Sequence, residues 1–134
     1  MAVILGLDMA DTLNYVIYST GSDPHISSVS VGDFNKDNLS DIAIANTAHT
    51  NISLRLGSGR GTFEGEIIYS TGLGSYPQYL SVDDFDNGNF TDILVANSRN
   101  DSIILLVEYR NRTFARQETY LTGNGSHPNS NFFW

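Results

Sequence analysis

The chain repeats itself with a period of 51 residues, and this repeat limits its possible folds more than any other feature. Residues 18–68 align with residues 69–119 without a gap, and 17 of the 51 aligned positions are identical. The tetrapeptide YSTG, for example, occurs at residues 18–21 and again at residues 69–72. A repeat of this length is typical of stacked or radially arranged structural units that bury their apolar faces against their neighbours.

Partial matches extend the repeat to both ends of the chain. Residues 1–17 match the back half of a unit, and residues 120–134 match the front of one. The chain therefore divides into a partial repeat, two full repeats at 18–68 and 69–119, and a second partial repeat. Because the two end pieces together lack the equivalent of residues 84–102, we expect the chain not to close a ring alone. Either it is a fragment of a longer chain, or other copies complete it.

Each full repeat contains short segments of alternating apolar and polar residues separated by turn residues, the pattern of half-buried strands. The expected strands are 28–31, 41–46, 52–56 and 66–69 in the first repeat, and 79–82, 92–97, 102–108 and 118–121 in the second. Four short antiparallel strands in about 50 residues is the size of one β-propeller blade. The sequence therefore predicts an all-β fold of tandem four-stranded blades, too few to close a propeller.

An acidic loop lies between the first two expected strands of each repeat. Residues 33–41 read DFNKDNLSD, which places side-chain oxygens at the first, third, fifth and ninth positions, and residues 84–92 read DFDNGNFTD. Closely spaced oxygens on a tight loop suit Ca²⁺, which takes six to eight oxygen ligands. The alternative is a turn closed by its own Asx-type hydrogen bonds, without a metal.

The repeats resemble the FG-GAP/VCBS family, which includes the propeller of integrin α chains. The resemblance rests on VGDFNKDNLSDIAIAN at residues 31–46, VDDFDNGNFTDILVAN at 82–97 and LGSGRGTF at 56–63. In that family the repeat is a four-stranded blade whose acidic loop binds calcium. The resemblance implies first-loop ligands from the side chains of Asp33, Asn35, Asp37 and Asp41 and the carbonyl of Leu39, and second-loop ligands from Asp84, Asp86 and Asp92.

Both loops depart from the family pattern. Asn38 and Asn89 stand at the sixth position, where the family usually has glycine, and asparagine tolerates the left-handed conformation that such a turn needs. The second loop also has Gly88 at the fifth position, where a carboxylate belongs, with Asp83 and Asn87 as possible substitutes. Because a lost charged ligand weakens calcium binding, we expect calcium in the first loop and leave the second open.

The composition excludes several kinds of partner. The formal net charge is −8, which disfavours nucleic acid and anionic membranes because both require basic patches. The longest apolar run, residues 103–107, is far too short to span a membrane. Cysteine is absent, so disulfides and thiolate metal sites do not arise.

Six Asn-x-Ser/Thr sequons favour a secreted, glycosylated protein, although an Asn- and Ser-rich chain produces some by chance. They begin at Asn38, Asn51, Asn89, Asn100, Asn111 and Asn124. The opening residues MAVILGLDMA do not have the basic start and small-residue cleavage site of a signal peptide.

No catalytic motif stands out. His25, His49 and His127 are scattered, and no nucleophile elbow or phosphate-binding glycine loop is present. We therefore expect a non-enzymatic extracellular protein, structural or adhesive, that self-associates head to tail into a fibre by strand complementation through residues 2–5 and 132–134. One alternative is a propeller fragment that binds carbohydrate or another protein through exposed loops expected at residues 22–28, 73–79 and 124–130. A further alternative is an accessory part of a polysaccharide-degrading enzyme.

Overall fold

The computed structural model describes residues 2–3, 18–19, 25–109 and 113–129, and these form ten strands and one short 3-10 helix. The first two strands are β1 (Ala2–Val3) and β2 (Tyr18–Ser19). The first full repeat contains β3 (Ile26–Gly32), β4 (Asp41–Asn46), the 3-10 helix η1 (Thr47–His49), β5 (Asn51–Gly57) and β6 (Phe63–Ser70). The second contains β7 (Pro77–Asp83), β8 (Asp92–Asn97), β9 (Ser102–Tyr109) and β10 (Thr113–Leu121).

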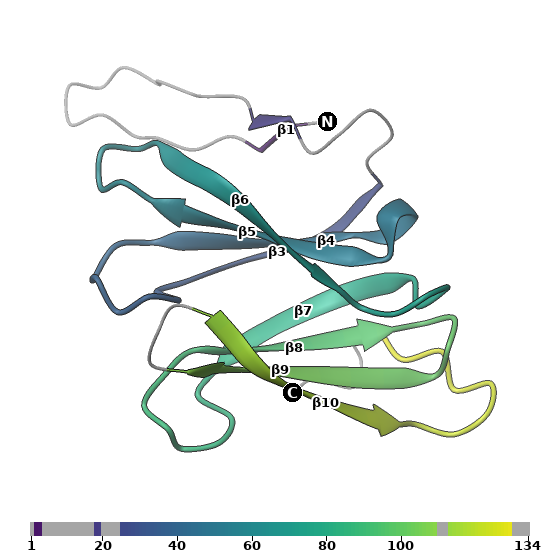
Figure 1. The fold of residues 1–134 in the computed structure, drawn as a ribbon. Coiled ribbons are helices and arrows are strands. Elements are labelled where there is room, and N and C mark those ends of the chain that lie inside the picture. Colours follow the sequence, from purple (N-terminus) through teal and green to yellow (C-terminus); the bar gives the residue numbers. More distant parts are fainter. Residues whose placement is uncertain (1, 4–17, 20–24, 110–112, 130–134) are drawn as a thin grey trace.

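Each full repeat folds into one antiparallel four-stranded sheet. The first blade has the order β3-β4-β5-β6 and the second has the order β7-β8-β9-β10, so neighbours in sequence are neighbours in space. The two registers are equivalent after the 51-residue shift, because Val31 pairs with Ile42 in one blade and Val82 with Ile93 in the other. The described sheets do not close into a ring (Figure 1), which confirms the predicted fold class of tandem propeller-type blades.

The strands agree with the sequence prediction, and β4 and β8 begin and end where expected. The other strands are longer than predicted at one or both ends because main-chain pairing continues beyond the alternating apolar residues. The 3-10 helix after β4 was not predicted. It ends at Thr50, which has a φ of 50°, and the counterpart turn in the second blade ends at Asp101 with the same φ.

The apolar core lies between the two blades (Figure 1). Alternate residues on each strand belong to this core because successive side chains of a strand face opposite sides of the sheet. The first blade contributes Phe34, Ala43, Ala45, Ile52 and Leu54, and the second contributes Leu80, Ile93, Val95, Ile104 and Leu106. Phe114 of β10 packs edge-on against Tyr69, with ring centroids 5.2 Å apart, and against Phe34 at 6.2 Å.

Polar contacts join the two blades where strands β3 and β7 lie side by side. The hydroxyls of Ser27 and Thr47 donate to the carbonyl of Pro77, at 2.7 and 2.8 Å. The amide of Leu80 donates to the hydroxyl of Ser28 at 3.1 Å, and the hydroxyl of Ser30 lies 3.3 Å from the Leu80 carbonyl. These bonds hold β3 and β7, the first strand of each blade, beside each other. The acidic loops that follow these strands therefore lie at the same edge of the molecule.

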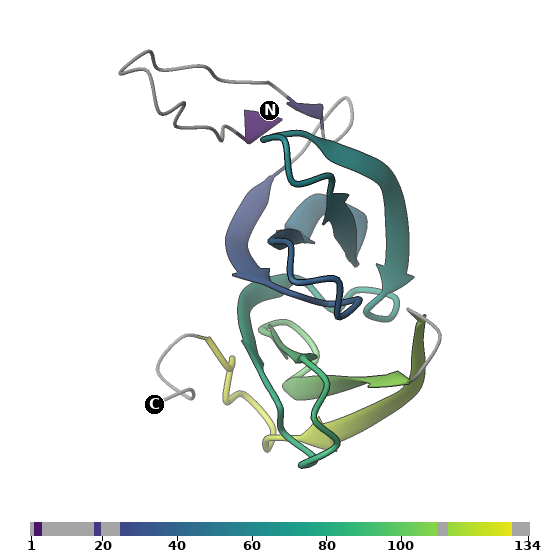
Figure 2. The same ribbon diagram turned by 90° about the vertical axis from the view of Figure 1, so that its left-hand side faces the viewer.

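The short β1–β2 pair lies on the side of the first blade away from the second blade (Figures 1 and 2). Ala2 pairs with Ser19 and Val3 with Tyr18, so this part of the N-terminal segment pairs within its own chain. The remaining parts of the predicted partial repeats, including residues 4–5, Asn111 and residues 132–134, lie outside the described residues. No helix in the described part of the chain is long and apolar enough to cross a membrane.

Candidate metal centre

Three carboxylates converge in the second acidic loop. Single oxygens of Asp84, Asp86 and Asp92 all lie within 4.8 Å of one another. Asp84 follows β7 directly, and Asp92 begins β8, so the loop brings the two ends of this connection together. A cluster of hard, charged oxygens is the ligand type that Ca²⁺ prefers.

The backbone of the second loop wraps around these carboxylates. Asp84 accepts bonds of 2.9 Å from the amides of Gly88 and Asn89, one at each oxygen. Asp86 accepts a second bond from the Gly88 amide at 2.8 Å. Asp92 accepts bonds from the amide of Phe85 and from the amide at the end of β9, at 2.9 and 3.1 Å. The loop is therefore held in shape by its own hydrogen bonds, as in the Asx-type turn that the sequence left open.

Gly88 lets the Asp86 carboxylate lie close to the main chain. A Cβ atom at residue 88 would lie only 2.7 Å from Oδ1 of Asp86, so a larger residue would require that carboxylate to shift. The first loop makes the equivalent bond with an aspartate at the fifth position, because the amide of Asp37 donates to Oδ1 of Asn35 at 3.1 Å. Gly88 therefore gives Asp86 a closer contact, at 2.8 Å, but the inward position of the third side chain does not depend on glycine.

The first loop has the same backbone plan with different side-chain contacts. Asp33 accepts bonds from the amides of Asp37 and Asn38, at 3.2 and 2.9 Å. The carboxylate of Asp37 accepts bonds from the amide of Leu39 at 2.8 Å and from the side-chain amide of Asn35 at 2.9 Å. Within the described residues, the second loop supplies a group of three converging acidic side chains and the first loop does not. Calcium in the first loop therefore stays a prediction.

Asparagine at the sixth loop position adopts the conformation predicted for it. Asn38 has a φ of 65° and Asn89 a φ of 63°, and both are in the left-handed region. Lys36 and Asn87, two residues earlier in each loop, also have positive φ, at 57° and 60°. Two left-handed residues in each loop make the sharp turn that directs backbone amides at Asp33 and Asp84.

The last aspartate of each loop is buried at the start of a strand. Asp41 accepts bonds of 2.8 Å from the amides of Phe34 and Gly57, which ties the loop to the end of β5. Burial raises the pKa of both Asp41 and Asp92, although these backbone amides oppose the rise. A cation beside either group would favour its ionised form and reverse this shift.

Sequence reasoning missed Glu108, which lies at the end of β9 and is only 4% exposed. Its Oε2 atom has no hydrogen-bond partner. Burial, together with the negative charges of Asp33, Asp92 and Asp41, raises the pKa of Glu108 to about 7, and Lys36 opposes this rise. A buried acid thus lies among the ligand candidates of both loops. The only feature of the sequence that singles out Glu108 is that the equivalent residue of the first repeat is Gly57.

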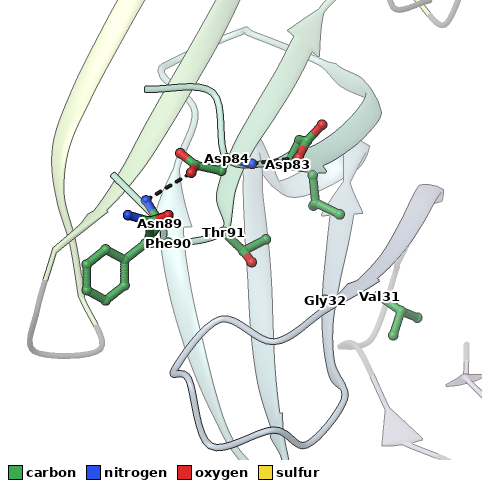
Figure 3. Close-up of a pocket in the computed structure, with 8 residues that line it drawn as sticks. Val31, Gly32, Asp83, Asp84, Asn89, Phe90 and Thr91 are labelled. Atoms are coloured by element: carbon green, nitrogen blue, oxygen red, sulfur yellow. Dashed lines mark hydrogen bonds between the residues drawn. The ribbon is translucent and has the colours of Figure 1, made fainter. Parts of the chain in front are cut away.

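A groove of about 390 Å³ opens beside the second loop, at the ends of β3 and β7 (Figure 3). Val31 and Val82 supply apolar surface, and Asp83, Asn89 and Thr91 supply polar groups. The groove lies between the blades, so it needs both repeats to form. Its lining residues lie outside the segments 22–28, 73–79 and 124–130 that the sequence suggested for ligand binding.

The sequon asparagines in the described part of the chain differ in exposure and in the hydrogen bonds of their side chains. Asn38, Asn89 and Asn124 are exposed on loops. Asn51 begins β5, where its side chain accepts a bond from Asn46 and donates one to the carbonyl of His49. Asn100 is exposed, but its side-chain oxygen accepts a bond of 2.6 Å from Ser102, the hydroxyl residue of its own sequon.

Comparison with known proteins identifies the repeat. The family model of the FG-GAP-like repeat matches residues 33–95, which run from the first acidic loop through most of β8. This segment is an FG-GAP-like repeat. The match includes both acidic loops of the FG-GAP-like segment and confirms the predicted family. No curated protein and no solved structure matches the chain.

Proposed function

We propose that this FG-GAP-like chain is a non-enzymatic extracellular module, structural or adhesive, in which calcium stiffens the connection between the first two strands of a blade. The observation that carries the proposal is the convergence of Asp84, Asp86 and Asp92. A divalent ion there would join the end of β7 to the start of β8, next to the strand that contacts the first blade. The role of the ion would be structural, to stiffen the blade, because the same loop recurs in each repeat.

Calcium is expected to stabilise the fold in a saturable way. For a dissociation constant of about 10⁻⁴ M, typical of extracellular modules at their tight end, 1 mM calcium would add roughly 1.4 kcal/mol. Asp86→Asn should remove most of this gain, because Asp86 is exposed and contributes a charged ligand rather than packing. Thermal unfolding with calcium and with a chelator measures the difference.

Two further variants serve as a charge control and as a test of calcium binding in the first loop. Glu64→Gln, on exposed β6, removes a negative charge that belongs to neither acidic loop and should leave the calcium effect intact. Asp37→Asn tests the first loop, and an equal loss from this variant would show that the first loop also binds. If calcium shifts the unfolding temperature of neither the natural chain nor the variants, the calcium role is wrong.

The exposed sequons support an extracellular, glycosylated protein. Expression in a secreting eukaryotic host should give glycans at Asn38 and Asn89, the exposed apices of the two loops. Asn51 should stay unmodified because two hydrogen bonds engage its side chain at the start of a strand. Glycopeptide mass spectrometry measures occupancy at each site, and full occupancy of Asn51 with none at Asn38 would contradict this assignment.

The groove in Figure 3 favours a second candidate function, the binding of carbohydrate or of an extracellular protein. It combines apolar side chains with a carboxylate, an amide and a hydroxyl, the mixture that recognises a polyol. A glycan array probed with the monodisperse chain should then give hits that Asp83→Ala abolishes. Leu73→Ala, which alters a fully exposed side chain elsewhere, should keep them. An empty array would leave the scaffold role as the better account.

A further inference from the structure

The free face of the second blade repeats a surface that the first blade buries. In the first blade, Phe34, Ala43, Ile52, Leu54 and Tyr69 pack toward the second blade. The 51-residue shift carries these positions to the face that points away from the first blade. We call it the trailing face, and its members are Phe85, Leu94, Ile103, Leu105 and Tyr120.

Equivalent residues on the two faces differ in exposure because only one face is covered. Phe34 is 2% exposed, whereas Phe85 is 39% exposed. Tyr69 packs against the core, whereas Tyr120 is 50% exposed. The described sheets place no layer over the trailing face, which lies on the opposite side of the second blade from β3–β6 (Figures 1 and 2).

The complementary surface recurs at the other end of the molecule. In the second blade, Leu80 is 1% exposed and Val82 packs on the core shared with the first blade. Their equivalents on β3, Val29 and Val31, are 42% and 54% exposed. We call these two valines the leading edge. Ile42 and Ile44 on the same face are already buried, so the available surface runs along β3.

We propose that the trailing face of one chain binds the leading edge of a second copy of the same chain. The chain carries the trailing half of a junction that it already makes internally, and along β3 it exposes the valines that match Leu80 and Val82 of that junction. Ser81 takes the place of Ser30, whose hydroxyl faces the Leu80 carbonyl in the internal junction, and can face the Val29 carbonyl of the second copy. This inference rests on the proposed scaffold role and specifies its partner.

The contact is head to tail, because two different surfaces meet. Such a contact leaves one free half at each end, so chains can add until a ring closes or a filament grows. It differs from the strand complementation through the termini that the sequence suggested. It uses side chains on the faces of formed blades.

Sedimentation velocity of the full chain tests the inference. The natural chain should show a sedimentation coefficient that rises with concentration. A trailing variant, Ser81→Lys with Phe85→Ser, and a leading variant, Val29→Lys with Val31→Lys, should each stay monomeric. An equimolar mixture of the two should form dimers that grow no further, because each variant keeps one intact half. Leu73→Lys should associate like the natural chain.

Three results would overturn the inference. The natural chain could remain a monomer at every concentration, or the leading variant could associate like the natural chain. The mixture could also fail to dimerise although each variant unfolds at the same temperature as the natural chain. Association of the leading variant alone would indicate a symmetric contact between two trailing faces. The unfolding temperature of the same samples with and without calcium tests the proposed function independently. A natural chain that stays monomeric but is stabilised by calcium would refute the junction between copies and would still support the scaffold role.

Discussion

Phe34→Ala is expected to destabilise the fold by about 3–5 kcal/mol, the usual range for removing a buried aromatic ring from a core. Phe34 is 2% exposed, and its ring packs edge-on against Phe114 of the other blade. Alanine would leave a cavity between the blades, which share this single core. Chemical denaturation monitored by circular dichroism measures the loss.

The repeat supplies a matched control for this prediction. Phe85→Ala removes the same ring from the equivalent position, but Phe85 is 39% exposed and its loss should cost about 1 kcal/mol or less. Equal losses from the two variants would show that the interface between the blades does not dominate stability. The comparison should be made at low chain concentration, because Phe85 also belongs to the proposed junction between copies.

Glu108→Gln is expected to stabilise the chain above neutral pH and to have little effect in acid. The pKa of Glu108 is raised from 4.5 to about 7, so the folded state holds a proton that the unfolded state releases. Stability is therefore lost as the pH rises from about 4.5 through 7, and the penalty is complete above that window. A rise of this size corresponds to about 3 kcal/mol, a gain that glutamine should recover.

The measurement compares unfolding free energies of the two chains at pH 4 to 8 in calcium-free buffer. Without calcium, no divalent ion neutralises Asp92 or the acids of the first loop. The curves of the natural chain and of Glu108→Gln should meet in acid and separate above neutrality. Parallel curves, or a less stable variant at high pH, would show that Glu108 is ionised in the fold at little cost.

The strands and the family were predictable because both depend on local sequence patterns. Alternating apolar residues determine which face of a strand is buried, and the 51-residue shift marks equivalent positions in both blades. β4 and β8 were placed to the residue because an aspartate and an asparagine bound each apolar run. The left-handed asparagines were predictable because they stand where the resembling family has glycine, whereas the second left-handed residue of each loop was not predicted.

The geometry of the site was less predictable because it depends on contacts between distant strands. The number of possible ligands in the sequence favoured the first loop, but the structure brings three carboxylates together in the second loop. Glu108 gave no local signal, since its burial among the acids of both loops arises only when the blades pack. The unequal exposure of Phe34 and Phe85 also follows from the number of blades, not from either loop.

The most direct test of the calcium-stiffened blade is a calcium titration followed by amide signals in ¹H–¹⁵N NMR spectra. We expect saturable shifts for Phe85, Gly88 and Asn89, whose amides donate hydrogen bonds to the three carboxylates, and none for Gly65 on β6. Asp86→Asn should weaken the response. Signals of the second loop that stay unchanged at millimolar calcium would contradict the account.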